Sequence, residues 1–347
     1  MAAILPSYLG ADVMKVMNWN IEWMNNWFSG NHEPRWGSGS LSAEEAQRVA
    51  EKVARVIRRT SPDILCVQEG PSAAQEMQLF LDDHLSEGGV PLYEALIGKA
   101  GGAQKLYVLR KLGGAAEIID HATDPLTLAL EDVWRADVDG DLLLQPYDFT
   151  RVPMVVDVKP AEGVPFRIVV LHTKSKYVHN GQVLFNDPAR RQEFIAAAMK
   201  ARRRIAAEGF RLRTYLDELI KANGDERVIV TGDWNDGPGP DFFERQYLSH
   251  NIADIVLGST FYPELIFQHP ILRHVSPALQ FTARFDDFVD NVRDRPLLLD
   301  HFAVSPALAA EVVDAGIAHD AFEDEIDGSG SARVQRASDH RPIWLEI

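Results

Sequence analysis

The sequence of 347 residues contains a single cysteine, so no disulfide can form within one chain. Cys66 lies in the apolar segment Ile64-Leu65-Cys66-Val67, which predicts a small buried side chain. A chain without disulfides is typical of a reducing compartment. We therefore expect a cytoplasmic protein.

Long apolar runs are also missing, and none approaches the roughly 18 residues that a membrane-spanning helix needs. The segment from Met1 to Met14 lacks the basic flank and the apolar stretch of a signal peptide. Internal repeats and low-complexity tracts are absent. With 46% hydrophobic and 25% charged residues, the composition is that of a globular protein and excludes a disordered chain.

Positive charge is scarce, because 35 Lys and Arg stand against 51 Asp and Glu. The net charge of −16 argues against a protein that coats nucleic acid generally. One basic tract within α-helical sequence is the exception. It could guide a polyanion toward a site, or it could be the solvated face of a helix. The tract consists of Arg190, Arg191, Lys200, Arg202, Arg203, Arg204, Arg211 and Arg213.

The length allows one or two domains, and we expect a single catalytic domain over residues 1–347. Insertions are expected near 111–145, which looks partly irregular, and near 251–295, which shows no clear periodicity. Ser42 and Glu45 form a capping box that predicts a helix from Ser42 to Arg59. A long helix is expected from Asp187 to Ile220, with a possible break at Gly209.

Polar side chains follow the predicted strands at the points where these strands end. The apolar run 228–230 leads to Asp233 and Asn235, and the strand over 13–19 leads to Asn20. Each ending alone could be an ordinary turn, but their recurrence indicates a shared site at the carboxyl ends of the strands. The residues at such endings are Asn20, Glu69, His172, Asp233, Asn235, Asp300, Asp339 and His340.

The residue types favour one kind of chemistry. Carboxylates and amides without a Cys/His cluster indicate Mg²⁺ or Mn²⁺ rather than structural zinc. A metal on a phosphate oxygen, a base for water and an imidazole facing the transition state are the parts that phosphoester hydrolysis requires. Phosphate is therefore the expected substrate group.

The ordered motifs resemble those of the endonuclease/exonuclease/phosphatase superfamily over nearly the whole chain. That group includes deoxyribonucleases, DNA repair enzymes, inositol polyphosphate phosphatases and bacterial sphingomyelinases. The resemblance implies a four-layer α/β sandwich, with two mixed β-sheets packed face to face and helices on the outside. The motifs are 19–22, Gln68-Glu69, 151–153, His172 with Lys174-Ser175, 232–235, 299–301 and 338–342.

The resemblance also implies the metal ligands. Glu69 would be the principal Mg²⁺ ligand, and Asn20, Glu22 and Asp339 would lie near the metal or its waters. Glu22 stands where many nucleases of the group have Asp. Asp236 lies beyond the shared motif, and we expect it to serve a turn.

Catalytic roles follow from the same resemblance. His340, oriented by Asp300, would contact the scissile phosphate and take part in proton transfer. Asp233 would orient or deprotonate the attacking water, and Asn235 would hold the transition state. His172 would contact the phosphate or assist the leaving group. Arg151 and Lys174 are the expected substrate-binding residues, although Arg151 could instead brace the site.

The expected function is a metal-dependent phosphodiesterase or nuclease acting on nucleic acid. A phosphomonoesterase or a phospholipid-headgroup phosphodiesterase is the alternative, and a non-catalytic binding protein on the same fold is a third. Trp23, Trp27 and Trp36 could stack on bases or pack within their loop. An exposed apolar hairpin would favour a membrane substrate, and the sequence shows no obvious one.

Overall fold

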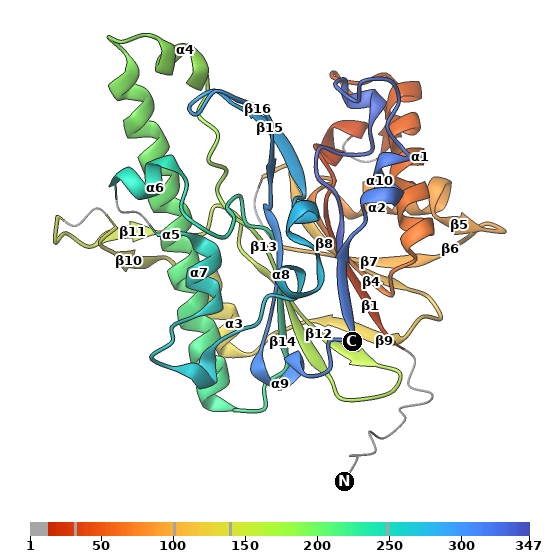
Figure 1. Cartoon of the computed structure of the whole chain (residues 1–347). Coiled ribbons are helices and arrows are strands. Elements are labelled where there is room, and N and C mark those ends of the chain that lie inside the picture. Colours follow the sequence, from red (N-terminus) through yellow and green to blue (C-terminus); the bar gives the residue numbers. More distant parts are fainter. Residues whose placement is uncertain (1–12, 31–32, 100–101, 139–140, 248–249) are drawn as a thin grey trace.

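Two β-sheets pack face to face, and helices cover both outer faces (Figure 1). This computed structural model describes residues 13–30, 33–99, 102–138, 141–247 and 250–347. The segment 1–12, for which no signal peptide is predicted, lies outside the described residues. The predicted four-layer α/β sandwich is confirmed.

The first sheet has six strands, and its central strand β1 ends at Asn20. β1 pairs in parallel with β4 and antiparallel with β19. The strand order is β18 (Asp314–Ile317), β19 (Ile343–Glu346), β1 (Lys15–Asn20), β4 (Ile64–Gly70), β8 (Lys105–Lys111) and β7 (Tyr93–Ile97).

The second sheet has five strands. Its order is β17 (Asp300–Val304), β14 (Val228–Asp233), β13 (Phe166–His172), β12 (Met154–Pro160) and β9 (Ala116–His121). β9 pairs with β12 along the edge, so part of the expected insertion at 111–145 belongs to the core sheet. Residues 116–121 of the partly irregular insertion expected there form a regular strand instead. Exposed and buried residues do not alternate strictly in β9, which left no clear period of two in the sequence.

The facing sides of the two sheets form the central core. Hydrophobic side chains from both sheets are buried there, among them Val16, Ile64, Val170, Ile229 and Phe302. Cys66 is fully buried in the same layer, as the sequence predicts. This dry layer holds the two sheets in a fixed relation.

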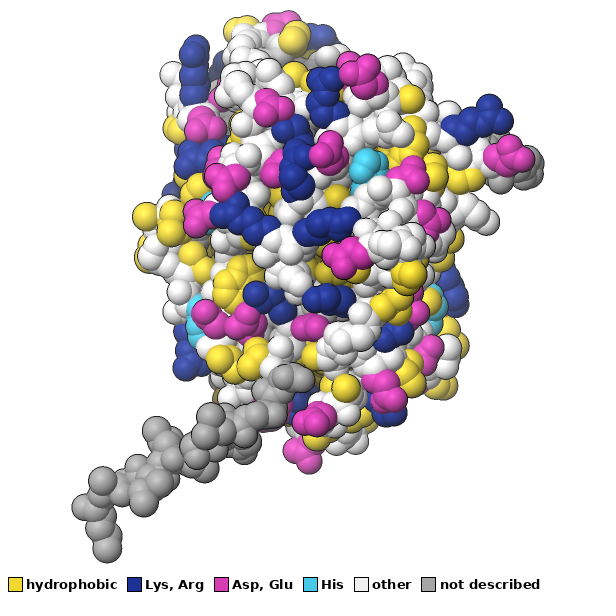
Figure 2. All heavy atoms as spheres, turned by 90° about the vertical axis from the view of Figure 1, so that its right-hand side faces the viewer, with side chains coloured by type: hydrophobic (Ala, Val, Ile, Leu, Met, Phe, Trp, Pro, Cys, Tyr) yellow, Lys and Arg dark blue, Asp and Glu magenta, His cyan; other side chains and the backbone are white. Residues whose placement is uncertain are grey.

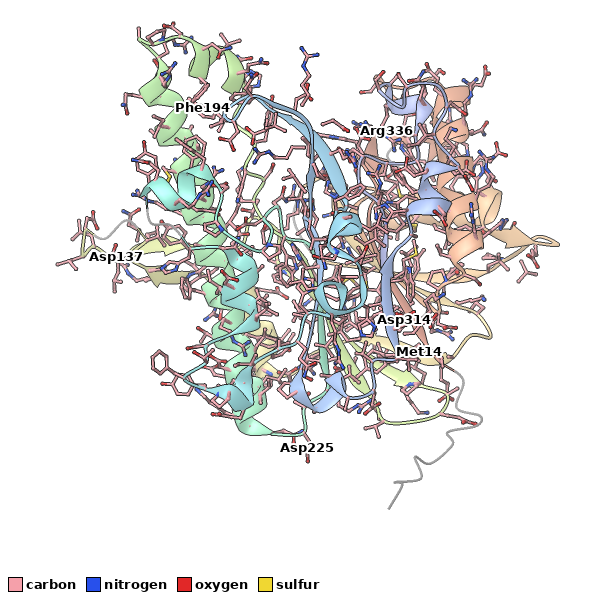
Figure 3. The ribbon with its side chains drawn as sticks, viewed as in Figure 1. Met14, Asp137, Phe194, Asp225, Asp314 and Arg336 are labelled. Carbon is pink, nitrogen blue, oxygen red and sulfur yellow. The ribbon has the colours of Figure 1, made fainter. Side chains whose placement is uncertain are left out.

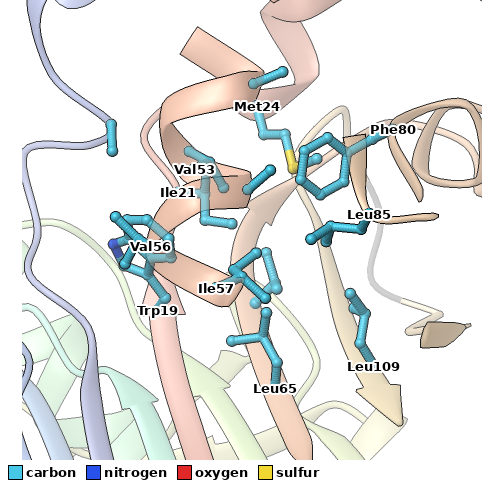
Figure 4. Packing of buried hydrophobic residues seen from close by; sticks show 14 of the residues in the cluster. Trp19, Ile21, Met24, Val53, Val56, Ile57, Leu65, Phe80, Leu85 and Leu109 are labelled. Carbon is cyan, nitrogen blue, oxygen red and sulfur yellow. The ribbon is translucent and has the colours of Figure 1, made fainter. Parts of the chain in front are cut away.

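Helix α1 (Ala43–Thr60) covers the outer face of the first sheet with α2 (Ala74–His84). Ser42 caps α1, and the predicted capping box with Glu45 is present. Val53 and Ile57 of α1 pack toward Trp19 and Leu65 of the sheet (Figure 4). α10 (His319–Glu323) lies beside α1.

Helix α5 (Arg191–Ala222) covers the second sheet together with α7 (Ile252–Leu257). The helix does not break at Gly209. A Cβ at Gly209 would lie 2.9 Å from Ile252 Cγ1, so glycine lets α7 approach α5 closely. The possible break was therefore wrong, because a mid-helix glycine here serves packing.

The remaining elements are short. The second expected insertion, 251–295, contains α7, α8 (Pro270–His274) and most of the hairpin formed by β15 (Ala283–Asp287) and β16 (Val292–Leu297). A further hairpin, β10 (Trp134–Ala136) and β11 (Gln145–Tyr147), projects beside α5 (Figure 1). The other short helices are α3 (Pro125–Leu128), α4 (Gly181–Asn186), α6 (Phe242–Tyr247) and α9 (Pro306–Ala309), and the small hairpins are β2 (Phe28–Ser29) with β3 (Arg35–Trp36) and β5 (Ser86–Glu87) with β6 (Val90–Pro91).

Acidic and basic side chains are interspersed on the face formed by the right-hand side of Figure 1, as Figure 2 shows. Ion pairs within α1 and from α1 to the C-terminal region contribute to this pattern, for example Arg55 with Glu51 and Glu325. This face therefore carries no single-sign patch that would attract a polyanion. Within the described residues, none of the helices is long and apolar enough to cross a membrane.

Candidate active site

Three predicted site residues lie side by side on adjacent strands of the second sheet. His172 of β13 is paired in register with Asp233 of β14, and Asp233 is paired with Asp300 of β17. Directly opposite residues on neighbouring strands point to the same side of a sheet. Strand register alone therefore brings these three side chains together.

Asp233 connects the two sheets. Asn20 at the end of β1 donates its Nδ2–H to Asp233 Oδ2 at 2.9 Å, and the Asn235 N–H donates to Oδ1 at 2.8 Å. Burial raises the pKa of Asp233 to about 7, although the nearby His340 opposes this rise. The carboxyl group is therefore poised to exchange a proton near neutral pH.

Gly232 lies in β14 directly before Asp233, where the backbone conformation favours glycine. Its φ is +145°, and a Cβ there would lie 1.8 Å from Leu171 O of the neighbouring strand. A side chain at this position would disrupt the pairing of β13 with β14. The glycine of the motif is thus required by close backbone approach.

His340 and Asp300 form a buried pair. His340 Nδ1 lies 2.7 Å from Asp300 Oδ2, and Trp19 Nε1 donates to the His340 carbonyl oxygen at 2.7 Å. Burial lowers the pKa of His340, but the carboxylates of Asp300 and Asp233 outweigh it and raise this pKa well above 6.5. The structure thus favours a protonated imidazole facing the cluster.

His172 has the opposite electrostatics. Its Nε2 lies 3.6 Å from Asp233 Oδ2 and 4.0 Å from Glu69 Oε1. Burial, followed by the positive charges of Arg151 and His340, lowers the pKa of His172 well below 6.5. The two histidines of the cluster therefore differ in charge, with a neutral His172 and a cationic His340.

Glu69 presents its two carboxylate oxygens differently. Oε2 accepts hydrogen bonds from the Trp23 N–H at 2.9 Å and from Gln104 Nε2 at 2.8 Å. Oε1 lies 3.5 Å from Asn20 Nδ2 and faces the cluster. Glu69 itself has a left-handed φ of 58°, as do Trp23 and Asn235 with φ of 50° and 54°. Such backbone conformations in non-glycine residues gather at functional sites.

Gln104 is a site residue that the sequence reading missed. It lies just before β8 and connects Glu69 to Arg151, whose Nη2 donates to Gln104 Oε1 at 2.9 Å. Arg151 Nη1 also donates to the Thr173 carbonyl oxygen at 3.2 Å. These two hydrogen bonds hold the Arg151 side chain beside Glu69 and His172. No strand-end motif marked Gln104, because it precedes its strand.

The oxygen atoms around Glu69 suit a hard divalent cation. Asn20 Oδ1 is buried without a hydrogen-bond partner among the described residues, and a buried oxygen of this kind is suited to bind a cation. The side-chain oxygen of Asn20 and Glu69 Oε1, which lies 3.5 Å from the Asn20 amide nitrogen, are the oxygen donors that fit Mg²⁺ or Mn²⁺. Asp233, Asp300 and His340 also lie close enough to hold an ion, but His340 Nδ1 is already bonded to Asp300. We therefore favour the oxygen set.

The other two expected metal neighbours are placed differently. Glu22 is paired with Arg336, whose Nη2 lies 3.0 Å from Oε1, and it also lies 3.5 Å from Arg333 Nε. Asp339 is partly buried beside the cluster and raises the pKa of Glu69, after the larger effect of burial. The carboxylate of Asp339 thus acts on the site directly, whereas that of Glu22 is held by arginines.

Glu208 of α5 positions the loops that follow two strands. It is fully buried, and Oε1 accepts from Thr150 N–H at 2.9 Å while Oε2 accepts from Lys174 N–H at 3.2 Å. Lys174 Nζ donates to the Ser175 carbonyl oxygen at 3.1 Å. The loops carrying Arg151 and Lys174 are thereby fixed to α5. The helical spacing of α5 gave no hint of this role, because Glu208 resembled a surface charge.

A partly buried lysine anchors the turn after Asp233. Lys176 Nζ lies 2.5 Å from Asp236 Oδ1, 2.6 Å from Glu244 Oε1 and 3.2 Å from Asp241 Oδ2. Asp236 also accepts the Ile252 N–H at 3.1 Å. Asp236 thus does more than shape a turn, since it joins the motif to α6 and α7.

The basic tract does not form a continuous charged strip. Arg202 is paired with Asp241, Arg204 with Glu208 at 3.3 Å, and Arg213 with Asp217 at 2.7 Å. Carboxylates neutralise these guanidinium groups, so they hold the fold together. Arg203 and Arg211 differ and line a groove described below.

Aromatic side chains lie exposed beside the cluster. Trp23, next to Glu69 through its N–H bond, is 54% exposed. Phe285 of β15 is 40% exposed, and its ring centroid lies 6.3 Å from that of His340. Trp27 is fully buried, and Trp36 packs on Phe28 at 4.9 Å. Trp27 and Trp36 therefore pack within their loop, as one of the two expectations held, whereas the exposed side chain of Trp23 is accessible to a ligand.

Comparisons with known proteins extend these observations. A model of the family described as "Endonuclease/Exonuclease/phosphatase family" matches residues 17–340. A search of curated proteins found no significant match.

Solved structures share the fold. Humanized D. rerio TDP2 with 14 mutations has a TM-score of 0.51 and 11% identity. The superposition covers 97% of this chain and 99% of the TDP2 chain. Truncated Caenorhabditis elegans TDP2 has a TM-score of 0.50 and 12% identity, covering 96% and 97%. A family protein from Bacteroides thetaiotaomicron has a TM-score of 0.50 and 16% identity, covering 96% and 94%. At these identities the likeness shows the fold alone.

Proposed function

Because the chain belongs to the endonuclease/exonuclease/phosphatase family, we propose that it is a divalent-metal-dependent phosphodiesterase that acts on nucleic acid. Members of this family are phosphoester hydrolases and generally depend on a divalent metal. The observation that carries the proposal is a buried cluster in which Asn20 is hydrogen-bonded to Asp233 and His340 to Asp300, while Asp233 and Asp300 lie opposite each other on adjacent strands.

Glu69 Oε1 and Asn20 Oδ1 would hold Mg²⁺ or Mn²⁺, with Asp339 close by and Glu22 in the surrounding shell. The bound ion would polarise a phosphate oxygen and stabilise charge that develops in the transition state. Hydrogen bonds to Oε2 from Trp23 and Gln104 keep the other oxygen directed inward.

Asp233 would orient and deprotonate the attacking water. Its raised pKa of about 7 suits a general base near neutral pH. Cationic His340, held by Asp300, would donate a hydrogen bond to the phosphate and stabilise its negative charge. Asn235 would contact the transition state, and neutral His172 would contact the phosphate or assist the leaving group.

The aromatic and basic groups beside the cluster support a nucleic-acid substrate. Trp23 and Phe285 are exposed next to Glu69 and His340, where they can stack on bases. Lys174 lies on the loop after His172 and adds positive charge in a protein that is otherwise acidic. Such a combination is typical of single-strand binding surfaces.

A lipid-headgroup phosphodiester is the second candidate, and one observation favours it. Leu142, Leu143 and Leu144 are 88%, 65% and 56% exposed beside the β10–β11 hairpin. The expectation that no apolar hairpin is exposed is therefore wrong. This hairpin projects beside α5, whereas Trp23 and Phe285 adjoin the catalytic cluster (Figure 1). For this reason nucleic acid remains the first candidate.

A single catalytic domain in the cytoplasm is also part of the proposal. The chain's one cysteine is buried and free, which agrees with a reducing compartment. A non-catalytic protein of this fold would be expected to lack one of the metal-ligand or catalytic side chains. This sequence has a suitable residue at each predicted position.

A substrate panel tests the proposal. The purified protein is assayed with Mg²⁺, Mn²⁺ and EDTA on single- and double-stranded DNA, RNA, a simple diester, phosphorylated inositols and sphingomyelin. We expect metal-dependent cleavage of nucleic acid that is lost in Asp233→Asn and retained in the exposed control Asp225→Asn. Activity that survives EDTA or Asp233→Asn would contradict the mechanism. Cleavage of sphingomyelin alone would contradict the nucleic-acid substrate and support the lipid-headgroup candidate.

A further inference from the structure

A groove of about 650 Å³ lies between α5 and the β10–β11 hairpin. This volume falls within the roughly 300–1,000 Å³ of small-molecule sites. Asp137, which lines it, lies at the opposite side of the molecule from Arg336, which contacts Glu22 at the candidate active site (Figure 3). The groove, named here the hairpin groove, is therefore separate from the catalytic cluster.

One face of α5 forms the floor of the hairpin groove. Arg203, Ala206, Ala207, Phe210 and Arg211 recur at helical spacing and all line it. The two alanines leave a hollow between the two arginines. About 12 Å of helix axis separates Arg203 from Arg211, because eight residues rise by about 1.5 Å each.

Within the described residues, the three arginines of the hairpin groove form no ion pair with a carboxylate. Within the described residues, Arg203 makes no ion pair or hydrogen bond, and Arg211 donates to the Ala129 carbonyl oxygen at 2.6 Å. Arg135 of β10 likewise donates to a carbonyl oxygen, that of Leu144, at 2.7 Å. Backbone carbonyls do not neutralise a guanidinium group, in contrast to the carboxylates that pair with other arginines of α5.

Charge in the hairpin groove is thus opposite to that of the whole chain, whose net charge is −16. Asp137 is the acidic lining residue, and its Oδ2 accepts the Leu142 N–H at 2.9 Å. Three guanidinium groups around a hollow suit a ligand with several anionic oxygens, because Arg binds phosphate with parallel N–H donors.

Aromatic rings line the same hollow. Phe210 and Tyr247 are 49% and 44% exposed, and His250 lies edge-on to Phe210 with ring centroids 5.4 Å apart. Trp134 lies under the Arg211 guanidinium, 5.8 Å from it. A flat ring could therefore pack against aromatic surface while its charged end meets the arginines.

We propose that the hairpin groove is a second ligand site, which binds a nucleoside di- or triphosphate through Arg135, Arg203 and Arg211 and packs its base against Phe210 and Tyr247. This site goes beyond the hydrolase function and does not depend on it. The length between Arg203 and Arg211 favours a phosphate chain over a single phosphate.

Isothermal titration calorimetry of the full chain with ATP, AMP, adenosine and inorganic phosphate tests the site. EDTA is present, so that metal-dependent binding at the catalytic cluster and hydrolysis are suppressed. Arg203→Gln is compared with Lys200→Gln, an exposed charge removed from the same helix outside the groove. Circular dichroism establishes that each variant is folded, and diester hydrolysis with Mg²⁺ is measured separately.

We expect ATP to bind more tightly than AMP, and adenosine and phosphate to bind weakly. Arg203→Gln should weaken ATP binding about tenfold or more, as loss of a charged hydrogen bond predicts, while Lys200→Gln and catalysis stay unchanged. Equal weakening by both variants, or equal affinity for phosphate and ATP, would overturn the proposal. Absence of hydrolase activity with intact ATP binding would refute only the proposed function.

Discussion

The imidazole of His340 and the carboxylate of Asp300 form a buried pair, with Nδ1 2.7 Å from Oδ2. The residues are 40 positions apart, and Asp300 begins β17 while His340 precedes β19. Their charges are complementary, because the negative charge of Asp300 raises the pKa of His340 against the effect of burial.

Asp300→Asn should therefore lower the pKa of His340 and reduce its cationic fraction at neutral pH. We expect kcat/KM to fall roughly 10²–10⁴-fold, the range for general acid–base groups. NMR titration of the imidazole together with steady-state kinetics measures both effects. Asp225→Asn, an exposed change at the opposite end of the molecule (Figure 3), is the control. An unchanged His340 pKa would contradict the pairing.

Gln104→Met should weaken metal binding. Glu69 Oε2 would lose one of its two hydrogen-bond donors, so the carboxylate could turn away from the cluster. Loss of such an outer-shell partner costs roughly 10–100-fold in metal affinity. Mn²⁺ binding followed by electron paramagnetic resonance reports the affinity without any substrate. Gln75→Met, exposed on α2, should leave it unchanged, and equal Mn²⁺ affinity in both variants would refute a positioning role for Gln104.

Gly232→Ala should destabilise the protein by more than about 2 kcal/mol, because the new Cβ would overlap Leu171 O and the backbone φ of +145° disfavours alanine. Urea unfolding measures the loss. Gly224→Ala is the matched control, since no atom lies within 4 Å of its Cβ position. There we expect no loss, and two equal effects would show that Gly232 has no special backbone requirement.

The contribution of the His269–His301 pair to stability should fall as the pH drops below about 6.5. His269 Nε2 lies 2.9 Å from His301 Nδ1, and His301 Nε2 lies 2.6 Å from the Asp236 carbonyl oxygen. Burial, the largest cause, lowers the pKa of both histidines from 6.5. Below that pH these two imidazoles bind protons in the unfolded chain but not in the folded one, so their contribution to the free energy of unfolding is full above pH 6.5 and decreases below it.

His269→Leu should make this pH dependence shallower, because one buried neutral imidazole is removed. It should also cost about 1–3 kcal/mol at pH 8 by leaving His301 Nδ1 without a partner. Urea unfolding from pH 8 to pH 5.5 measures both, with the exposed His179→Leu as control. A slope equal to that of the unsubstituted protein would contradict a neutral His269.

Local sequence patterns determined much of this protein. The capping box of α1 and the apolar strands that end in polar residues were readable because they depend on nearest neighbours along the chain. Strands whose carboxyl ends carry Asn20 and Asp233 were therefore predicted, and so was the fold, through the ordered motifs. The family match over 17–340 agrees with that reading.

Only the tertiary structure decided which side chains support the cluster. Gln104 and Glu208 touch the site through hydrogen bonds to residues 35 and 58 positions away, and no local pattern encodes such contacts. The same reason explains Gly209, which looked like a helix break until α7 was seen to pack on it. The different environments of Arg202 and Arg203 have the same cause. These neighbours in sequence point to different faces of α5, so Arg203 lines the hairpin groove whereas Arg202 pairs with Asp241.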